Sequence, residues 1–160
     1  MPIISLNNLS AHLRKTVYTS SSDYYRYRVV RHRARRRAIP EQLTLTVSLR
    51  GTREVKDNYQ IFRLAGLLDA FSEAIFRKVA AKCVDDSFSN VILDLSQIDL
   101  MDSSGLGAIV QISKKVTSSE GRLQIVTNAR VTQTLKLVKL DKVFSLHPDL
   151  VSAIAAFKPA

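Results

Sequence analysis

The chain has 160 residues and a formal net charge of +10, from 24 Lys and Arg against 14 Asp and Glu. This length suits one domain with a core that needs no disulfides, and it leaves no room for two full domains. Hydrophobic residues make up 46% and charged residues 24%, which excludes a wholly disordered chain and a predominantly membrane-embedded one.

The positive charge is concentrated at the start of the chain. Residues 1–40 carry nine Lys or Arg and one acid, Asp23, whereas the remaining 120 residues carry 15 basic and 13 acidic side chains. Residues 1–40 show no sustained period of 2 or 3.6, which predicts a basic, disordered arm. Its role stays open between a tether, a targeting segment such as a transit peptide, an over-long start, and a nucleic-acid-binding segment with stacking tyrosines.

Residues 41–160 are expected to form one folded domain. Apolar and polar residues alternate from Leu43 to Leu49, which predicts a first strand. Residues 51–58 are polar and turn-like, and 59–64 form a second strand that pairs with the first as a hairpin. The sequence Gly66-Leu67-Leu68-Asp69 ends that second strand.

Helices and strands alternate after this hairpin. Apolar residues from Phe71 to Cys83 recur at spacings of three and four, which predicts an amphipathic helix with Cys83 on its buried stripe. Val91–Leu95 is a nearly continuous apolar run and predicts the central strand. The remaining predicted elements are a helix from Leu106 to about Ser119, a strand at 123–126, a helix at 131–138, a short strand at 143–146 and a terminal helix at 150–157. The order predicts an α/β domain.

Several classes of site are excluded by composition. The single cysteine has no partner for an internal disulfide or a CxxC motif, which fits a reducing cytoplasm. The three histidines are too widely spaced to predict a metal site, and no apolar run reaches the roughly 18 residues of a membrane span. We therefore expect no metal, no cofactor and no membrane span, and no direct DNA binding by the nearly neutral residues 41–160.

The segment Asp102–Gly107, between the central strand and the next helix, carries the most chemistry. Asp102, Ser103 and Ser104 can each cap a helix, although capping needs only one of them. The two glycines of the segment leave backbone amides open to an approaching group, and a helix N-terminus favours an anion. Helix capping with tight packing, and an anion or phosphorylation site, both remain open at this point.

Enzyme motifs fit this segment poorly. A dinucleotide-binding GxGxxG lacks its third glycine here, a GxSxG nucleophile elbow is absent, and no Gly-Lys-Ser/Thr phosphate loop occurs. The sequence therefore predicts no catalytic residues.

Two stretches resemble the STAS domain family, and most closely its bacterial anti-sigma-factor antagonists. VILDLSQIDLMDSSGLG, from Val91 to Gly107, resembles the family's signature, and Gly66-Leu67-Leu68-Asp69 resembles its GxLD element. Leu67 departs from the pattern, because the family often has Glu there. The resemblance covers essentially all of residues 41–160 and none of the arm.

The resemblance implies a fold and a regulatory function. The fold is a small mixed sheet of four to five strands with helices packed largely on one face. An ATP-using anti-sigma serine kinase phosphorylates Ser103, and a PP2C-type phosphatase reverses the reaction. The dephosphorylated form binds the kinase and frees the sigma factor, so the protein acts in cytoplasmic signal transduction and is not an enzyme.

The resemblance also places residues around Ser103. Asp69 and Asp102 are expected beside the phosphoacceptor, with further partner-binding positions at Ser104, Gly105, Leu106 and Gly107. A phosphate at Ser103 is expected to take hydrogen bonds from the amides of Ser104, Gly105 and Leu106. The alternative is a non-phosphorylated STAS scaffold or transporter-accessory subunit that acts only through protein contacts.

Overall fold

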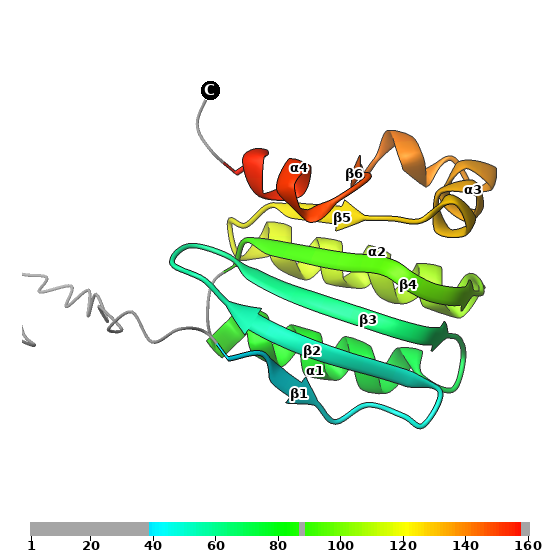
Figure 1. The fold of residues 1–160 in the computed structure, drawn as a ribbon, viewed down its shortest axis with the longest axis horizontal. Helices are drawn as coiled ribbons and strands as arrows, with labels where there is room; N and C mark the ends of the chain where they lie inside the picture. Colours follow the sequence, from blue (N-terminus) through cyan, green and yellow to red (C-terminus); the bar gives the residue numbers. More distant parts are fainter. Residues whose placement is uncertain (1–38, 87–88, 158–160) are drawn as a thin grey trace, which may run out of the picture. The chain divides into compact units, whose positions relative to one another are not determined.

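A computed structural model describes residues 39–86 and 89–157 and shows a six-stranded mixed sheet in the order β1-β2-β3-β4-β5-β6 (Figure 1). The strands are β1 (Glu41–Leu43), β2 (Leu49–Val55), β3 (Gln60–Leu68), β4 (Val91–Met101), β5 (Leu123–Val126) and β6 (Ser145–His147). The helices are α1 (Glu73–Asp86), α2 (Ser103–Ser118), α3 (Ala129–Leu137), the 3-10 turn η1 (Leu140–Lys142) and α4 (Leu150–Ala155). The predicted α/β class is confirmed, with one strand more than expected. The predicted arm lies outside the described residues, apart from its last two positions.

The sheet combines an antiparallel and a parallel half. β1, β2 and β3 are antiparallel neighbours, whereas β3, β4, β5 and β6 run parallel. Helices α1, α2 and α3 connect the successive parallel strands, as parallel pairing requires. The carboxyl ends of β3 and β4 therefore meet at one edge, where α1 and α2 begin.

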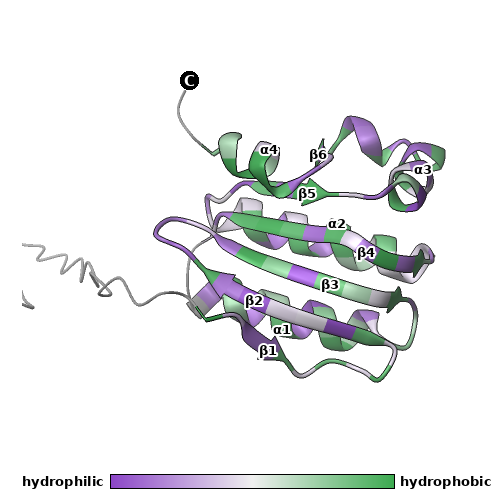
Figure 2. Ribbon diagram, in the orientation of Figure 1, coloured by the Kyte–Doolittle hydropathy of each residue, from purple (hydrophilic) through white to green (hydrophobic). Residues whose placement is uncertain are grey.

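The main core lies between the sheet and helices α1, α2 and α3. Phe62 on β3 and Leu93 on β4 are fully buried against Phe76 of α1 and against Ile109 and Ile112 of α2. Figure 2 shows hydrophobic residues along β3 and β4, interrupted by hydrophilic ones. Burial of each such side chain stabilises the fold by about 1.5–3 kcal/mol.

The opposite face of the sheet is covered only in part. A second cluster joins Ile61, Ile92 and Val126 of β3, β4 and β5 to Ala153 and Phe157 at and just after α4. These strand residues alternate with those of the main core, because successive side chains point to opposite faces of a sheet. The predicted placement of the helices, largely on one face, is confirmed.

The predicted first strand at Leu43–Leu49 is wrong. β1 ends at Leu43 and β2 begins at Leu49, and the Thr46 hydroxyl accepts the Leu49 amide at 3.1 Å in the bend between them. Residues 51–55, predicted as a turn, belong to β2. The polar residues of this stretch are accommodated by pairing, Arg53 with Gln60 and Glu54 with Lys56 and Arg63. The predicted hairpin exists, but between β2 and β3.

The predicted helix start also changes. α1 begins at Glu73, and Phe71 is 85% exposed instead of lying on the buried stripe. Cys83 is half-buried and packs against the main core, as predicted.

Candidate functional site

Asp102 is the residue that caps α2. Its backbone is extended (φ −97°, ψ −174°), and its Oδ1 accepts the amides of Ser104 at 2.8 Å and Gly105 at 3.0 Å. The next amide, of Leu106, donates to the Asp102 carbonyl at 3.0 Å. All three amides that a phosphate on Ser103 was expected to use are thus engaged by Asp102 in the unmodified chain.

Asp102 also connects the two ends of the site. Its Oδ2 accepts the amide of Ala70 at 3.2 Å, and its own amide donates to the Leu68 carbonyl at 3.3 Å. The end of β3, the loop that follows it and the start of α2 are thus held by one residue.

Asp69 holds the first turn before α1. Its Oδ1 accepts the amides of Phe71 at 3.0 Å and Ser72 at 3.1 Å, and also the Ser72 hydroxyl at 3.1 Å. Ser72 is fully buried, and the hydrogen bonds of its hydroxyl with the Asp69 amide and the Leu67 carbonyl hold the turn. Asp69 and Asp102 were both expected beside Ser103. The amide of Ala70, the residue after Asp69, donates to the Asp102 carboxylate and connects the two positions. Each carboxylate also accepts backbone amides of its own turn.

The two serines differ in accessibility. Ser103 is exposed at the first position of α2, whereas Ser104 is half-buried. Among the described residues, neither hydroxyl has a hydrogen-bond partner. Because Asp102 caps α2, the helix does not need the Ser103 hydroxyl as a cap.

The two glycines of the segment have different roles. A Cβ on Gly105 would lie 2.2 Å from the Leu68 carbonyl oxygen, so only glycine fits there. A Cβ on Gly107 would meet nothing within 4 Å. Gly105 therefore permits close packing of α2 on β3, whereas no packing contact requires glycine at position 107. Leu106 is half-buried and packs against the main core.

Gly66 is also structural. Its φ is +105°, and a Cβ there would lie 2.1 Å from the Ser48 carbonyl oxygen, which accepts the Leu67 amide at 2.9 Å. The pairing of β3 with β4 shifts register between Gly66 and Leu67. The first motif thus shapes the end of β3 from which Asp69 follows.

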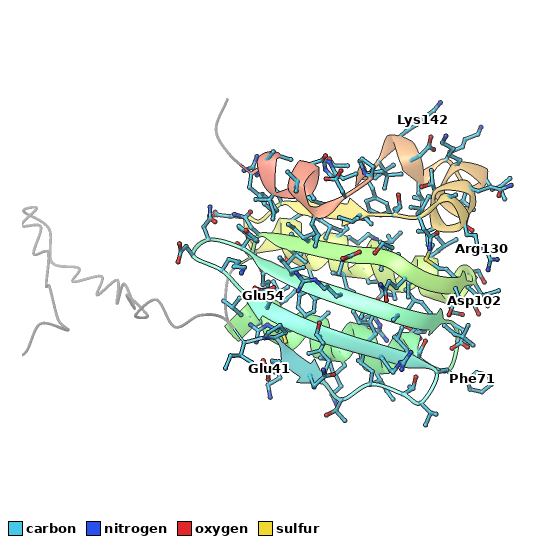
Figure 3. All side chains as sticks on the ribbon, viewed as in Figure 1. Glu41, Glu54, Phe71, Asp102, Arg130 and Lys142 are labelled. Carbon is cyan, nitrogen blue, oxygen red and sulfur yellow. The ribbon has the colours of Figure 1, made fainter. Side chains whose placement is uncertain are left out.

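Two exposed apolar side chains at this edge were missed from the sequence. Phe71 is 85% exposed and Leu100, near the end of β4, is 55% exposed. Figure 3 shows Phe71 and Asp102 at the same end of the sheet. Phe71 had been assigned to the apolar spacing of a helix, whereas Leu100 follows the predicted central strand, and an apolar pattern alone does not distinguish a surface position from a core one.

Residues 39–86 and 89–157 hold neither a candidate metal site nor a helix that could span a membrane. These residues contain no group of three His, Cys, Asp or Glu arranged to hold a metal ion. None of the described helices is long and apolar enough to cross a membrane.

Known proteins match this chain in sequence. The profile of the STAS domain matches residues 52–153. A Thermotoga maritima protein provisionally described as an anti-sigma factor antagonist is 30% identical over 82 residues, covering 50% of this chain and 73% of that protein. The anti-sigma-F factor antagonist RsfB of Mycobacterium tuberculosis is 24% identical over 120 residues, covering 74% of this chain and 93% of RsfB.

Solved structures share the fold. An anti-sigma factor antagonist from Mycobacterium paratuberculosis gives a TM-score of 0.63 at 24% identity, covering 71% of this chain and 97% of that one. The phosphorylated form of SpoIIAA from Bacillus gives a TM-score of 0.54 at 18% identity, covering 68% of this chain and 99% of that one.

Proposed function

Since the chain belongs to the STAS domain family, we propose that it is an anti-sigma factor antagonist and that phosphorylation of Ser103 controls its binding to an anti-sigma serine kinase. The observation that carries the proposal is the free, exposed hydroxyl of Ser103 at a helix N-terminus that Asp102 already caps. The named relatives support the general role.

In this proposal the kinase and the phosphatase carry out the phosphoryl-transfer and hydrolysis reactions. The Ser103 Oγ attacks the γ-phosphorus of ATP held by the kinase, the hydroxyl proton is lost and ADP leaves. A PP2C-type phosphatase hydrolyses the phosphoserine and restores the hydroxyl. This chain supplies the acceptor and the docking surface, so it is not an enzyme, and it acts in the cytoplasm together with these partners.

The modification changes charge more than shape. A phosphate adds about −1.5 to −2 charges at pH 7. Asp102 is its neighbour, and the amides of Ser104 and Gly105 are occupied by the Asp102 carboxylate. The added charge therefore gains few hydrogen bonds from the helix and raises the local negative potential. An interface formed around an uncharged hydroxyl loses contacts and gains repulsion.

The surface around Ser103 suits a protein partner. The aromatic ring of Phe71 and the side chain of Leu100 are exposed, and Gly107 leaves room for a partner to approach. Exposed apolar groups surrounded by polar ones mark interaction surfaces, and a central aromatic residue often dominates their binding energy.

Phosphate mapping tests the acceptor. The full chain is incubated with a candidate anti-sigma kinase and ATP, and the product is analysed by tandem mass spectrometry. We expect one phosphate, on Ser103, that is absent from Ser103→Ala and present in the matched variant Ser104→Ala. A phosphate on Ser104, or none with the kinase that binds the chain, would overturn the assignment.

Affinity capture separates the switch from a scaffold. We expect wild type and Ser103→Ala to retain the kinase and Ser103→Asp to lose it, with all three equally folded by circular dichroism. A non-phosphorylated scaffold or transporter-accessory subunit predicts the same partners for all three proteins.

A further inference from the structure

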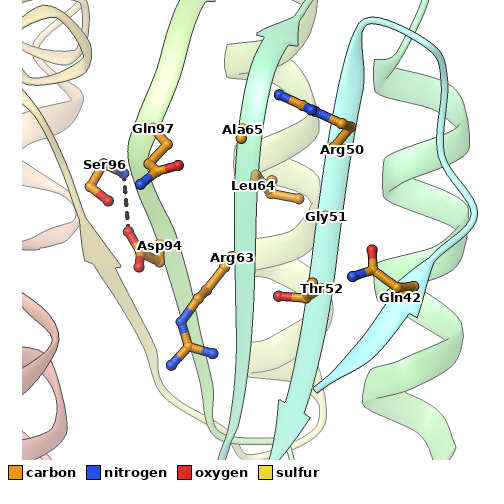
Figure 4. A pocket seen from close by; sticks show the side chains of 10 residues that line it. All are labelled: Gln42, Arg50, Gly51, Thr52, Arg63, Leu64, Ala65, Asp94, Ser96 and Gln97. Carbon is orange, nitrogen blue, oxygen red and sulfur yellow. Dashed lines mark hydrogen bonds between the residues drawn. The ribbon is translucent and has the colours of Figure 1, made fainter. Parts of the chain in front are cut away.

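A polar hollow of about 360 Å³ lies on the sheet face opposite α1 and α2, beyond the part that α4 covers (Figure 4). Its lining includes Arg50, Thr52, Arg63, Asp94, Ser96 and Gln97. This volume is at the lower end of the range for ligand pockets, so a small molecule suits it. None of these residues belongs to the Ser103 site.

An irregularity in β4 forms one wall of the hollow. Arg63 of β3 pairs with Asp94, but Ala65 pairs with Gln97, so β4 carries one extra residue in between. As a result two successive residues, Ser96 and Gln97, are both exposed. A bulge of this kind redirects side chains and is common beside functional sites.

Asp94 places a carboxylate in the hollow at little exposure. The residue is 8% exposed, and its Oδ1 accepts the Ser96 amide at 3.1 Å, which holds the bulge. Within the described part of the chain, no cation lies within 4.0 Å of this carboxylate and no second hydrogen bond reaches it. The second carboxylate oxygen of Asp94 opens to the hollow, where it is available to a cationic donor.

The two arginines of the hollow differ in whether their guanidinium groups are already paired. The Arg63 Nη1 donates to Glu54 Oε2 at 2.8 Å, so Arg63 is already paired. Arg50 is exposed, and its guanidinium has no hydrogen bond or ion pair with any residue that the structure describes. The hollow thus offers one free anion-binding group and one free cation-binding group.

The sheet register fixes the separation of these two groups. Arg50 is opposite Ala65 and Asp94 is opposite Arg63, on the two sides of β3. Two strand spacings across and two residues along give about 12 Å between their Cα atoms. The Arg50 guanidinium does not point toward Asp94 (Figure 4), but the exposed side chain is long enough that its rotation toward the hollow leaves a gap suited to a ligand with its two charges close together.

We propose that this hollow binds a small zwitterion of the α-amino acid class, with its ammonium group on Asp94 and its carboxylate on Arg50. The guanidinium of Arg50 can hold a carboxylate through two parallel hydrogen bonds. The side chains of Thr52, Ser96 and Gln97 are available to the rest of the ligand.

Ligand-observed NMR and titration calorimetry of the full chain test this proposal with each standard L-amino acid as the probe. We expect at least one to bind, and its N-acetyl and methyl-ester derivatives to bind at least tenfold more weakly. Asp94→Asn keeps an oxygen for the Ser96 amide but loses the charge, so it should weaken the free amino acid tenfold or more without altering the N-acetyl form. Arg50→Gln should do the same for the free amino acid without altering the ester.

Matched controls are Asp57→Asn and Arg130→Gln, which lie outside the hollow and should leave binding unchanged. Unfolding midpoints establish that every variant is folded. The proposal is overturned if no amino acid binds, or if binding is insensitive to both Asp94→Asn and Arg50→Gln. Binding of inorganic phosphate that tolerates Asp94→Asn would instead identify a simple anion site and would also overturn it.

Discussion

The carboxylate of Asp102 joins the start of α2 to Ala70, thirty-two residues earlier, through a hydrogen bond of 3.2 Å. The same carboxylate caps α2 through Ser104 and Gly105. The loop before α1, which carries Phe71, and the helix that carries Ser103 are therefore parts of one surface.

This double role predicts a stability difference between two substitutions. Asp102→Ala removes the acceptor for three amides, and we expect it to lower the free energy of unfolding by about 1–2 kcal/mol. Asp102→Asn retains one acceptor oxygen, so its loss should be smaller. Urea unfolding of both variants measures the difference, and an Asp102→Ala protein as stable as wild type would contradict the described network.

The glycines predict effects of opposite sign. Gly105→Ala places a methyl group against the Leu68 carbonyl, a backbone atom, and should cost about 1–3 kcal/mol or more. Gly107→Ala has free space and replaces a poor helix former, so it should stabilise the protein by up to about 1 kcal/mol. Denaturant midpoints of the two variants check both signs. Equal destabilisation would mean that Gly107 is also packed.

The exposed ring of Phe71 predicts a binding defect without a folding defect. Phe71→Ser should weaken kinase binding at least tenfold, or about 1.4 kcal/mol, because an exposed aromatic at the same edge of the sheet as Ser103 can anchor a partner. Val151→Ser is the matched control, since Val151 is an exposed apolar residue of α4. Surface plasmon resonance gives both affinities, and similar losses in the two variants would exclude a specific role for Phe71.

Glu54 predicts a dependence of stability on pH. Burial raises the pKa of Glu54, but hydrogen bonds and positive charges from Lys56 and Arg63 outweigh burial, and the pKa lies below its ordinary value of 4.5. A depressed carboxylate pKa contributes stability above the unfolded pKa, and that contribution is lost as the pH falls through the folded one.

We therefore expect Glu54→Gln to cost about 1 kcal/mol near neutral pH, a modest value because both cations are more than a third exposed. The difference from wild type should shrink below about pH 4.5. Thermal unfolding at several pH values measures it. A difference that stays constant down to acid pH would assign the loss to packing.

The sequence was a good guide where an element is buried. The apolar run at Val91–Leu95 and the helical spacing of Ile109, Ile112 and Val116 reflect burial in the main core, and both elements were predicted correctly. β2 was misplaced because Thr52, Arg53 and Glu54 resemble turn residues, although Glu54 is buried through its ion pairs with Lys56 and Arg63. Whether other elements cover a face of a strand depends on segments that are distant in the sequence, and a local pattern of residues does not contain that information.

The candidate site shows the same limit. The composition of Asp102–Gly107 indicated both a cap and an acceptor, but only the folded chain shows that Asp102 is the cap. The need for Gly105 arises from Leu68, which is far away in the sequence. The contacts of Asp102 with Ala70 and of Gly105 with Leu68 join segments that are far apart in the sequence.

The close fit of Gly105 on the Leu68 carbonyl also limits how Ser103 can be recognised. The first turn of α2 cannot be drawn out into an extended strand without breaking its contacts with the end of β3. The kinase proposed to modify Ser103 must therefore accept the intact domain as its substrate. A short linear peptide copied from this segment would lack most of what is recognised.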